Sequence, residues 1–192
     1  MVKQYTDAQL LERVKSLPSF KGFPKNKWLL GVRSSEDLAD KFDDKFYLFE
    51  GEKFICIASG TTNPGANCLK NYDSTPGRKG AAIVKADECY YDVWRYGLHK
   101  GKVIAYQQNA HFKIVRDSDK DLKSEDTGTV SLEMCGINFH PADYNLNGHA
   151  FKTLIGGWSE GCQVCNNIDE YVQIMRQLNK QPLLTYVILN EF

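Results

Sequence analysis

The first patterned stretch of the chain has the spacing of an amphipathic helix. Thr6 stands three positions before Gln9, a pair that is typical of a capping box at a helix start. The pattern predicts a helix over residues 7–17 and, because Pro18 cannot continue it, a connector up to residue 27. The apolar positions of this helix share one face: Leu10, Leu11, Val14 and Leu17.

From residue 45 onward the pattern changes to short runs of aromatic and β-branched residues. Residues 46–49 and 53–59 flank the turn Glu50-Gly51-Glu52 and predict a hairpin. The spacing of the runs is typical of an all-β sandwich or barrel. Further strands are predicted over residues 82–85, 90–96, 102–106, 112–116, 129–139 and 184–189.

Two segments depart from the strand pattern. Residues 60–79 hold three glycines and two prolines and predict an irregular loop. Residues 168–178 have an apolar helical face, with Asn166 or Asn167 as the cap, and predict a late helix. The chain is therefore predicted to be mainly β, of the α+β class. We expect a single compact unit over residues 28–192, preceded by the helix and connector of residues 1–27.

The composition is that of an ordinary globular protein of 192 residues, with 24 basic and 24 acidic side chains. A net charge of zero gives no overall field that would attract nucleic acid, so none is expected as a partner. No apolar run approaches the length needed to cross a bilayer, so no membrane partner is expected. The first residues lack the pattern of a secretory signal, which predicts synthesis in the cytoplasm.

The most unusual stretch is the glycine-rich segment of residues 156–165, with the sequence GGWSEGCQVC. Two glycines before Trp158 and one directly before Cys162 suit a tight turn better than a helix or strand. A thiol at the end of such a turn can have its own amide and its neighbour's aimed at one point, as an oxyanion hole requires. Cys162 is therefore a candidate nucleophile, with the amides of Gly161 and Cys162 as candidate oxyanion donors.

A nucleophilic thiol needs a base, and His140 is the best placed of the four histidines. It ends the apolar run of residues 132–139, which is interpreted as a strand that penetrates the core. Its imidazole would then project from a rigid edge. The chain between His140 and Cys162 is long enough for a strand, a loop and a return. In this hypothesis the imidazole lowers the pKa of the thiol and carries its proton.

These residues resemble the motif of the bacterial L,D-transpeptidase catalytic domain, which is a His, a spacer, then Ser or Thr, His, Gly and Cys. His140 and the sequence Ser159-x-Gly161-Cys162 follow that order, after a hairpin that carries YLF at residues 47–49 and IASG at residues 57–60. The segments GINFH (136–140) and WSEGCQV (158–164) also resemble a divergent branch met in phage and bacterial peptidoglycan-active proteins. The likeness spans residues 46–170.

The resemblance implies a β-sandwich-like catalytic domain that acts on peptidoglycan stem peptides, as an L,D-carboxypeptidase or an L,D-transpeptidase. Cys162 would attack the carbonyl carbon of an L-to-D peptide bond and form a thioacyl-enzyme. His140 would serve as the base and then as the acid, and Ser159 would act through its hydroxyl or as part of the turn. The chain departs from the motif at Glu160, where the motif has His, and at residues 163–164. No metal or cofactor is expected.

Three ring-bearing side chains near the motif are candidates for substrate binding. His149 lies in a predicted lid or hairpin between the base and the nucleophile, and Tyr144 and Trp158 are expected to wall the acyl pocket. The predicted partner is a peptidoglycan stem peptide. The sequence leaves the oligomeric state open, with a monomer favoured. Because peptidoglycan lies outside the cytoplasm, the hypothesis includes phage- or effector-type release to the cell wall.

Other interpretations of the same residues stay open. The sequence Cys162-x-x-Cys165 has thioredoxin-type spacing, although the flanking pattern is mostly β. Together with His140 and His149, these two cysteines would supply four zinc ligands of the right type. A papain-like protease is disfavoured because its Cys precedes its His. The non-enzymatic alternative is a module that binds cell-wall glycan or peptide through aromatic side chains: Tyr90, Tyr91, Trp94 and Trp158.

Overall fold

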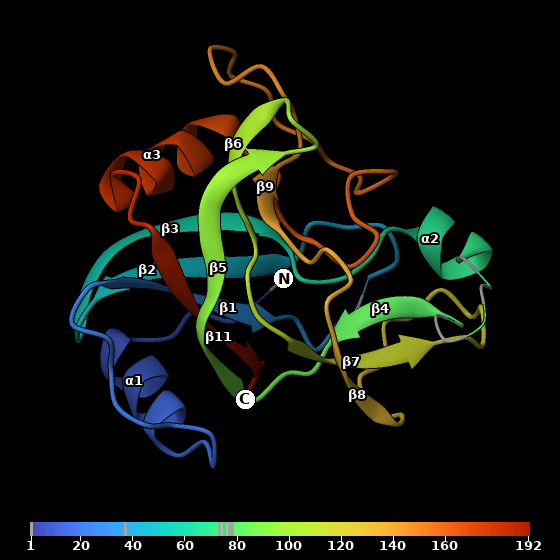
Figure 1. The fold of residues 1–192 in the computed structure, drawn as a ribbon, viewed down its shortest axis with the longest axis horizontal. Coiled ribbons are helices and arrows are strands. Elements are labelled where there is room, and N and C mark those ends of the chain that lie inside the picture. The colour runs from blue at the N-terminus through green and yellow to red at the C-terminus, as the bar shows by residue number, and fades with distance from the viewer. Residues whose placement is uncertain (1, 37, 73, 75, 77–78) are drawn as a thin grey trace.

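Strands dominate the architecture of the chain (Figure 1). The computed structural model describes residues 2–36, 38–72, 74, 76 and 79–192. Within these residues, eight strands close into a barrel, three strands form a second sheet, and three helices accompany them. The prediction of a mainly β fold of the α+β class is therefore confirmed.

The barrel has the strand order β1-β11-β5-β6-β9-β10-β3-β2. Neighbouring strands are antiparallel except for two parallel pairs, β1 with β11 and β9 with β10. The barrel strands are β1 (Lys27–Arg33), β2 (Asp44–Glu50), β3 (Lys53–Thr61), β5 (Glu88–His99), β6 (Val103–Gln108), β9 (Phe139–Pro141), β10 (Gln163–Cys165) and β11 (Leu183–Asn190).

The second sheet has the order β4-β7-β8 and lies beside the barrel, next to α2 (Figure 1). The remaining elements are β4 (Ala81–Val84), β7 (Phe112–Asp117), β8 (Val130–Glu133), α1 (Asp7–Lys15), α2 (Ala66–Asn71) and α3 (Ile168–Leu178). Both predicted helices are confirmed. Thr6 and Gln9 form the capping box of α1, and the side chain of Asn167 caps α3.

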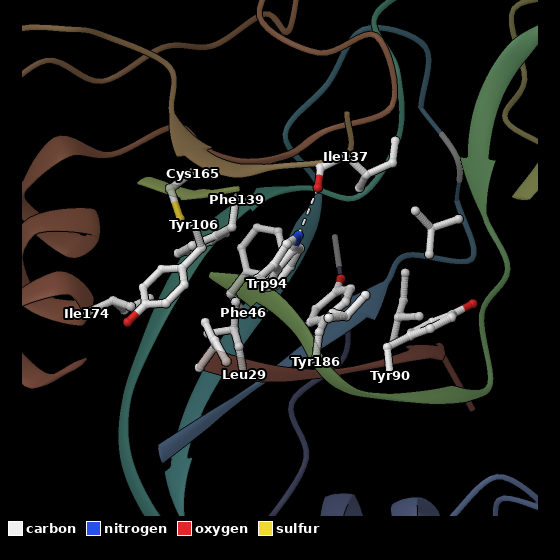
Figure 2. Packing of buried hydrophobic residues seen from close by; sticks show 14 of the residues in the cluster. Leu29, Phe46, Tyr90, Trp94, Tyr106, Ile137, Phe139, Cys165, Ile174 and Tyr186 are labelled. Atoms are coloured by element: carbon white, nitrogen blue, oxygen red, sulfur yellow. Dashed lines mark hydrogen bonds between the residues drawn. The ribbon is translucent and has the colours of Figure 1, made fainter. Parts of the chain in front are cut away.

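The interior of the barrel is filled by aromatic rings around Trp94 (Figure 2). The Trp94 ring is fully buried, with its centroid 4.5 Å from that of Tyr186 and 5.9 Å from that of Phe139. Its indole nitrogen donates a hydrogen bond to the carbonyl oxygen of Ile137 over 2.8 Å. Buried indoles need such a partner. The bond therefore attaches the segment before β9 to the core.

Strand β1, which the sequence did not predict, is buried on both faces. Leu29 belongs to the cluster inside the barrel, whereas Trp28 and Leu30 belong to a second cluster with Leu10 and Val14 of α1. Because α1 covers the outer face, the strand lacks the alternation of apolar and polar residues that makes a half-buried strand recognisable.

The structure differs from the sequence prediction in two further segments. The strand expected over residues 129–139 is broken, because β8 ends at Glu133 and β9 begins at Phe139. Gly136 lies between them with a φ of +85°, which is incompatible with a continuous strand. In the predicted loop of residues 60–79, α2 forms because Leu69 packs against Ala81 and Ile83 of β4.

We expect Gly60→Ala to destabilise the barrel where β3 meets β10. A Cβ atom at Gly60 would lie 2.3 Å from the carbonyl oxygen of Val164 and 2.5 Å from the Phe46 ring, so the strands would have to separate. Overpacking of this kind costs about 1–3 kcal/mol. Urea unfolding measures the loss in free energy. Gly157→Ala is the control, because nothing lies within 4 Å of a Cβ atom there. Equal unfolding free energies for the two variants would contradict the prediction.

Candidate active site

A buried hydroxyl holds the glycine-rich turn before β10. Ser159 Oγ accepts a hydrogen bond from the amide of Gly161 over 3.1 Å and donates one to the carbonyl of Cys162 over 2.8 Å. The carbonyl of Ser159 accepts from the amide of Gly65 over 2.9 Å. Ser159 is fully buried, so removal of its hydroxyl would leave backbone groups of the turn unpaired. Ser159 therefore positions Cys162.

Gly161 has two independent reasons to be glycine. Its φ is +120°, in a region that side chains disfavour. A Cβ atom there would also lie 2.5 Å from the carbonyl oxygen of Ala82 in β4. The turn therefore packs directly against the backbone of β4 in the second sheet. This contact holds the residue that follows, Cys162, close to that sheet.

The sulfur of Cys162 lies between two backbone groups of the segment that precedes β9. The thiol donates to the carbonyl of Gly136, and Sγ accepts from the amide of Asn138, both over 3.5 Å. Thiols are weak donors and weak acceptors. These contacts therefore orient the sulfur but leave it able to react. Cys162 itself is partly exposed.

Gln108 shapes the segment that holds the sulfur. Its Oε1 atom accepts hydrogen bonds from three consecutive amides, those of Cys135, Gly136 and Ile137, over 3.1, 2.7 and 2.9 Å. Its amide nitrogen donates to two further carbonyl groups. These bonds replace the strand pairing that residues 134–138 lack, and they aim the carbonyl of Gly136 at the thiol.

The parallel pairing of β9 with β10 brings the predicted base and thiol to one cavity. Val164 is the partner of His140 in this pair. Cys162 directly precedes β10, two residues before Val164, and it lines the same cavity as His140. Phe139 and Cys165 point to the opposite face and belong to the core cluster.

His140 is fully buried and has a defined tautomer. Its Nδ1 atom lies 3.0 Å from the carbonyl oxygen of Pro141. A carbonyl can only accept, so Nδ1 carries the proton and Nε2 holds the free lone pair. Nε2 has no hydrogen-bond partner among the residues that the structure describes. The imidazole is therefore in the form that can take up a proton.

His140 and Cys162 line the same cavity, which has a volume of about 490 Å³. Residues of α2 and of β4 also line this cavity. Arg116 also lines it but is engaged, because its Nε atom lies 3.1 Å from Oε1 of Glu133. The cavity lining further includes Trp158 and three polar or charged residues: His99, Lys100 and Glu160.

Burial sets the protonation state of both reacting groups. It lowers the pKa of His140 to about 3, with the neighbouring His99 adding to the effect. It raises the pKa of Cys162 to about 11, because the surrounding protein desolvates the sulfur. Both shifts run away from a thiolate–imidazolium pair and favour a neutral thiol and a neutral imidazole in the resting site. His140 is not among the groups that shift the thiol pKa, so the lowering of that pKa by the imidazole stays a hypothesis.

One of the two predicted oxyanion donors is already engaged. The amide of Gly161 donates to Ser159 Oγ, so it does not point freely into the cavity. The amide of Cys162 makes no hydrogen bond within the part of the chain that the structure describes. The amide of Gly161 is therefore not a free donor, which leaves the amide of Cys162 as the remaining candidate.

The three predicted substrate-binding residues separate in the structure. Trp158 lines the cavity, and Tyr144 packs edge-on against it with ring centroids 5.1 Å apart. His149 lies elsewhere, in a depression beside α3, where its Nδ1 atom is 2.9 Å from a carboxylate oxygen of Asp169. The structure therefore does not bring His149 to the thiol, because its loop folds toward α3.

Sequence reasoning missed two residues of the site, His99 and Asn138. His99 ends β5, and its ring stacks on that of His140 with centroids 3.8 Å apart and 19° between the planes. Asn138 contacts both the sulfur of Cys162 and the ring of His99. Asn138 lies only two positions before His140, and this closeness in the sequence could have identified it as a residue of the site. No local signal links His99 to the motif, since only the barrel closure brings the end of β5 there.

The zinc and redox interpretations find no support in this geometry. Cys165 is fully buried in the core and His149 lies in a different depression, so the four proposed zinc ligands do not meet. Within the described residues, no group of three or more potential ligands is placed to hold a metal ion. Cys162 lines the cavity, whereas Cys165 is fully buried in the core and does not line it, and both thiols are free.

Fold and site together define a mainly β protein in which a partly exposed thiol and a buried neutral imidazole share one cavity. Comparison with protein-family models, with curated proteins and with solved structures finds no match. In the described part of the chain, no helix is long and apolar enough to cross a membrane. Function is therefore inferred from the site and from the motif.

Alkylation of Cys162 by iodoacetamide should accelerate about tenfold per pH unit from pH 7 to pH 9, because the thiolate is a minor species below its raised pKa. Mass spectrometry of tryptic peptides measures the rate at each cysteine. Cys165, which is fully buried, should stay unlabelled in the folded protein and serves as the internal control. A rate that is independent of pH between 5 and 7 would show a preformed thiolate–imidazolium pair and contradict the prediction.

Proposed function

We propose that this chain catalyses cysteine-dependent acyl transfer on peptidoglycan stem peptides, as an L,D-carboxypeptidase or an L,D-transpeptidase. The observation that carries the proposal is that Cys162 and His140 line one cavity, with the His140 proton on Nδ1 and no partner for Nε2 among the described residues. A neutral thiol becomes a nucleophile when a base removes its proton as the new bond forms. The pair has the chemistry for that step.

In the first half-reaction, the sulfur of Cys162 bonds to the carbonyl carbon of the scissile peptide while its proton moves to Nε2 of His140. The carbonyl electron pair shifts to oxygen, and the amide of Cys162 donates a hydrogen bond to that oxyanion. When the intermediate collapses, the carbon–nitrogen bond breaks and the leaving amine takes the proton from His140. A thioester and a free amine result.

In the second half-reaction, water or an acceptor amine attacks the thioester, and His140 takes the proton of the attacking group. Water completes a carboxypeptidase cycle, and an amine completes a transpeptidase cycle. When the second intermediate collapses, the carbon–sulfur bond breaks and the proton on His140 passes to the leaving sulfur, which restores the neutral pair. A neutral resting pair suits this cycle, because no charge has to be buried before the substrate arrives.

Support for the peptidoglycan substrate comes from the order of His140, Ser159, Gly161 and Cys162, which resembles the L,D-transpeptidase motif. We also propose that the barrel and the second sheet together correspond to the β-sandwich-like catalytic fold of that family. Trp158, braced by Tyr144, would wall the acyl side of the cavity. In this proposal the chain reaches peptidoglycan by phage- or effector-type release.

Two of the positions at which the chain departs from the motif, Glu160 and Gln163, have different surroundings in the structure. Glu160 is exposed and lines the cavity, so it replaces the motif His with a negative charge at the site. Gln163 is fully buried, and its Oε1 atom accepts from the hydroxyl of Tyr186 over 2.6 Å. Gln163 therefore supports β10 from inside the barrel and does not meet substrate.

Incubation with defined muropeptides should give products that depend on the Cys162 thiol. Loss of D-Ala, exchange and cross-linking each change the muropeptide mass differently, so mass spectrometry identifies the reaction. Cys162→Ala should abolish turnover because no thioester can form. Cys89→Ala, which removes a thiol from the cluster under α1, should retain activity.

Equal turnover by Cys162→Ala and the parent, or no turnover by the parent, would reject the catalytic assignment. A pull-down on purified sacculi then distinguishes the remaining interpretation. Retention of the chain on sacculi without any change in muropeptide mass identifies a wall-binding module instead of an enzyme.

A further inference from the structure

His99 and His140 form a buried pair of stacked imidazoles beside the thiol. Their ring centroids are 3.8 Å apart with 19° between the planes, and the two residues are 5% and 0% exposed. His99 belongs to the end of β5, whereas His140 belongs to β9. Two strands that are not neighbours in the barrel therefore each contribute a ring to the same stack.

Asn138 anchors the second ring in a defined tautomer. Its Oδ1 atom accepts from the amide of Gln108 over 2.9 Å, which fixes the orientation of the side-chain amide. The nitrogen Nδ2 then faces Nδ1 of His99 over 3.1 Å. Because an amide nitrogen only donates, Nδ1 of His99 accepts and the proton of that ring sits on Nε2.

Three contacts connect four residues of the site in a chain from Cys162 through Asn138 and His99 to His140. The backbone amide of Asn138 reaches the sulfur of Cys162, and its side chain reaches His99, which covers His140. His140 in turn lines the cavity with Cys162. A movement of the His99 ring would therefore change its contacts with both His140 and Asn138, whose backbone amide bonds to the sulfur.

We propose that His99 is a positioning residue of the thiol site. Its ring, anchored through Asn138 and laid flat on His140, holds His140 in the neutral tautomer whose Nε2 lone pair is free to accept the Cys162 proton. Stacking blocks the tilt of the His140 ring and keeps water away from it, and a water-free imidazole stays neutral. The inference depends on the proposed function for the purpose of the arrangement, whereas the arrangement can be tested without substrate.

Besides His99, Lys100 acts on His140, and other charged or titratable groups lie around the cavity or near its aromatic lining. Lys100 follows β5 and also lowers the pKa of His140, in the same direction as burial. Glu160 and Cys162 line the cavity from the turn before β10. Lys102 lies over the Tyr144 ring, 5.3 Å from its centroid. None of these groups is altered by a substitution at His99, so its contribution can be isolated.

The test compares His99→Gln with His99→Phe by NMR of the histidine side chains. Glutamine removes the ring but keeps an acceptor for Asn138, whereas phenylalanine keeps a flat ring over His140. Nitrogen chemical shifts report the tautomer of His140, and a pH titration reports its pKa. His111→Phe, at an exposed histidine, is the matched control. All variants are first checked for cooperative unfolding.

In the parent and the control, His140 should hold its proton on Nδ1 and stay neutral down to about pH 4, since its pKa is lowered to about 3. In His99→Gln, we expect the pKa of His140 to rise by more than one unit and the tautomers to mix. His99→Phe should restore a single tautomer and a lowered pKa. A single Nδ1–H tautomer with an unshifted pKa in His99→Gln would overturn the proposal.

This readout separates the inference from the proposed function. If muropeptides are not turned over but the titration behaves as expected, the positioning role of His99 stands and the peptidoglycan assignment fails. If turnover depends on Cys162 but the tautomer of His140 is unchanged by substitution of His99, the proposed function stands and the positioning role of His99 fails.

Discussion

The parallel pairing of β9 and β10 is the constraint on which the site depends. It places His140 beside Val164, and Cys162, which directly precedes β10, lines the same cavity as His140. A slip of one residue would turn one of the two side chains into the barrel. The register is held from inside, because Phe139 and Cys165 occupy fixed places among the core side chains. Packing in the hydrophobic core thus fixes the strands that place His140 and Cys162 at the cavity.

Three side-chain amides, two of them buried, connect the core to the segments around the thiol. Gln108 accepts three backbone amides before β9, Asn138 joins the sulfur to His99, and Gln163 links the hydroxyl of Tyr186 to the carbonyl of Gly161 over 3.2 Å. Each amide both donates and accepts, so a single side chain can satisfy groups from two segments. Fully satisfied networks of this kind favour one arrangement over its alternatives.

Local signals in the sequence predicted the first and last helices and the hairpin of β2 and β3. The capping box at Thr6, the apolar face of residues 168–178 and the hairpin of β2 and β3 were all recognisable. Strand β1 was not, because α1 hides its second face, and β10 is too short to show a pattern. The turn that carries Cys162 was visible from its glycines. His99 was not, since its contact with His140 depends on how the barrel closes.

Both the barrel and the second sheet contribute residues to the cavity. His140 of β9 and Cys162 of the turn before β10 line the cavity together with residues of α2 and β4, and β4 lies against that turn where Gly161 approaches Ala82. Changes of side-chain size on α2 can therefore alter what fits against the thiol while the reacting groups keep their places. A fold arranged in this way lets specificity diverge under selection without rebuilding the chemistry.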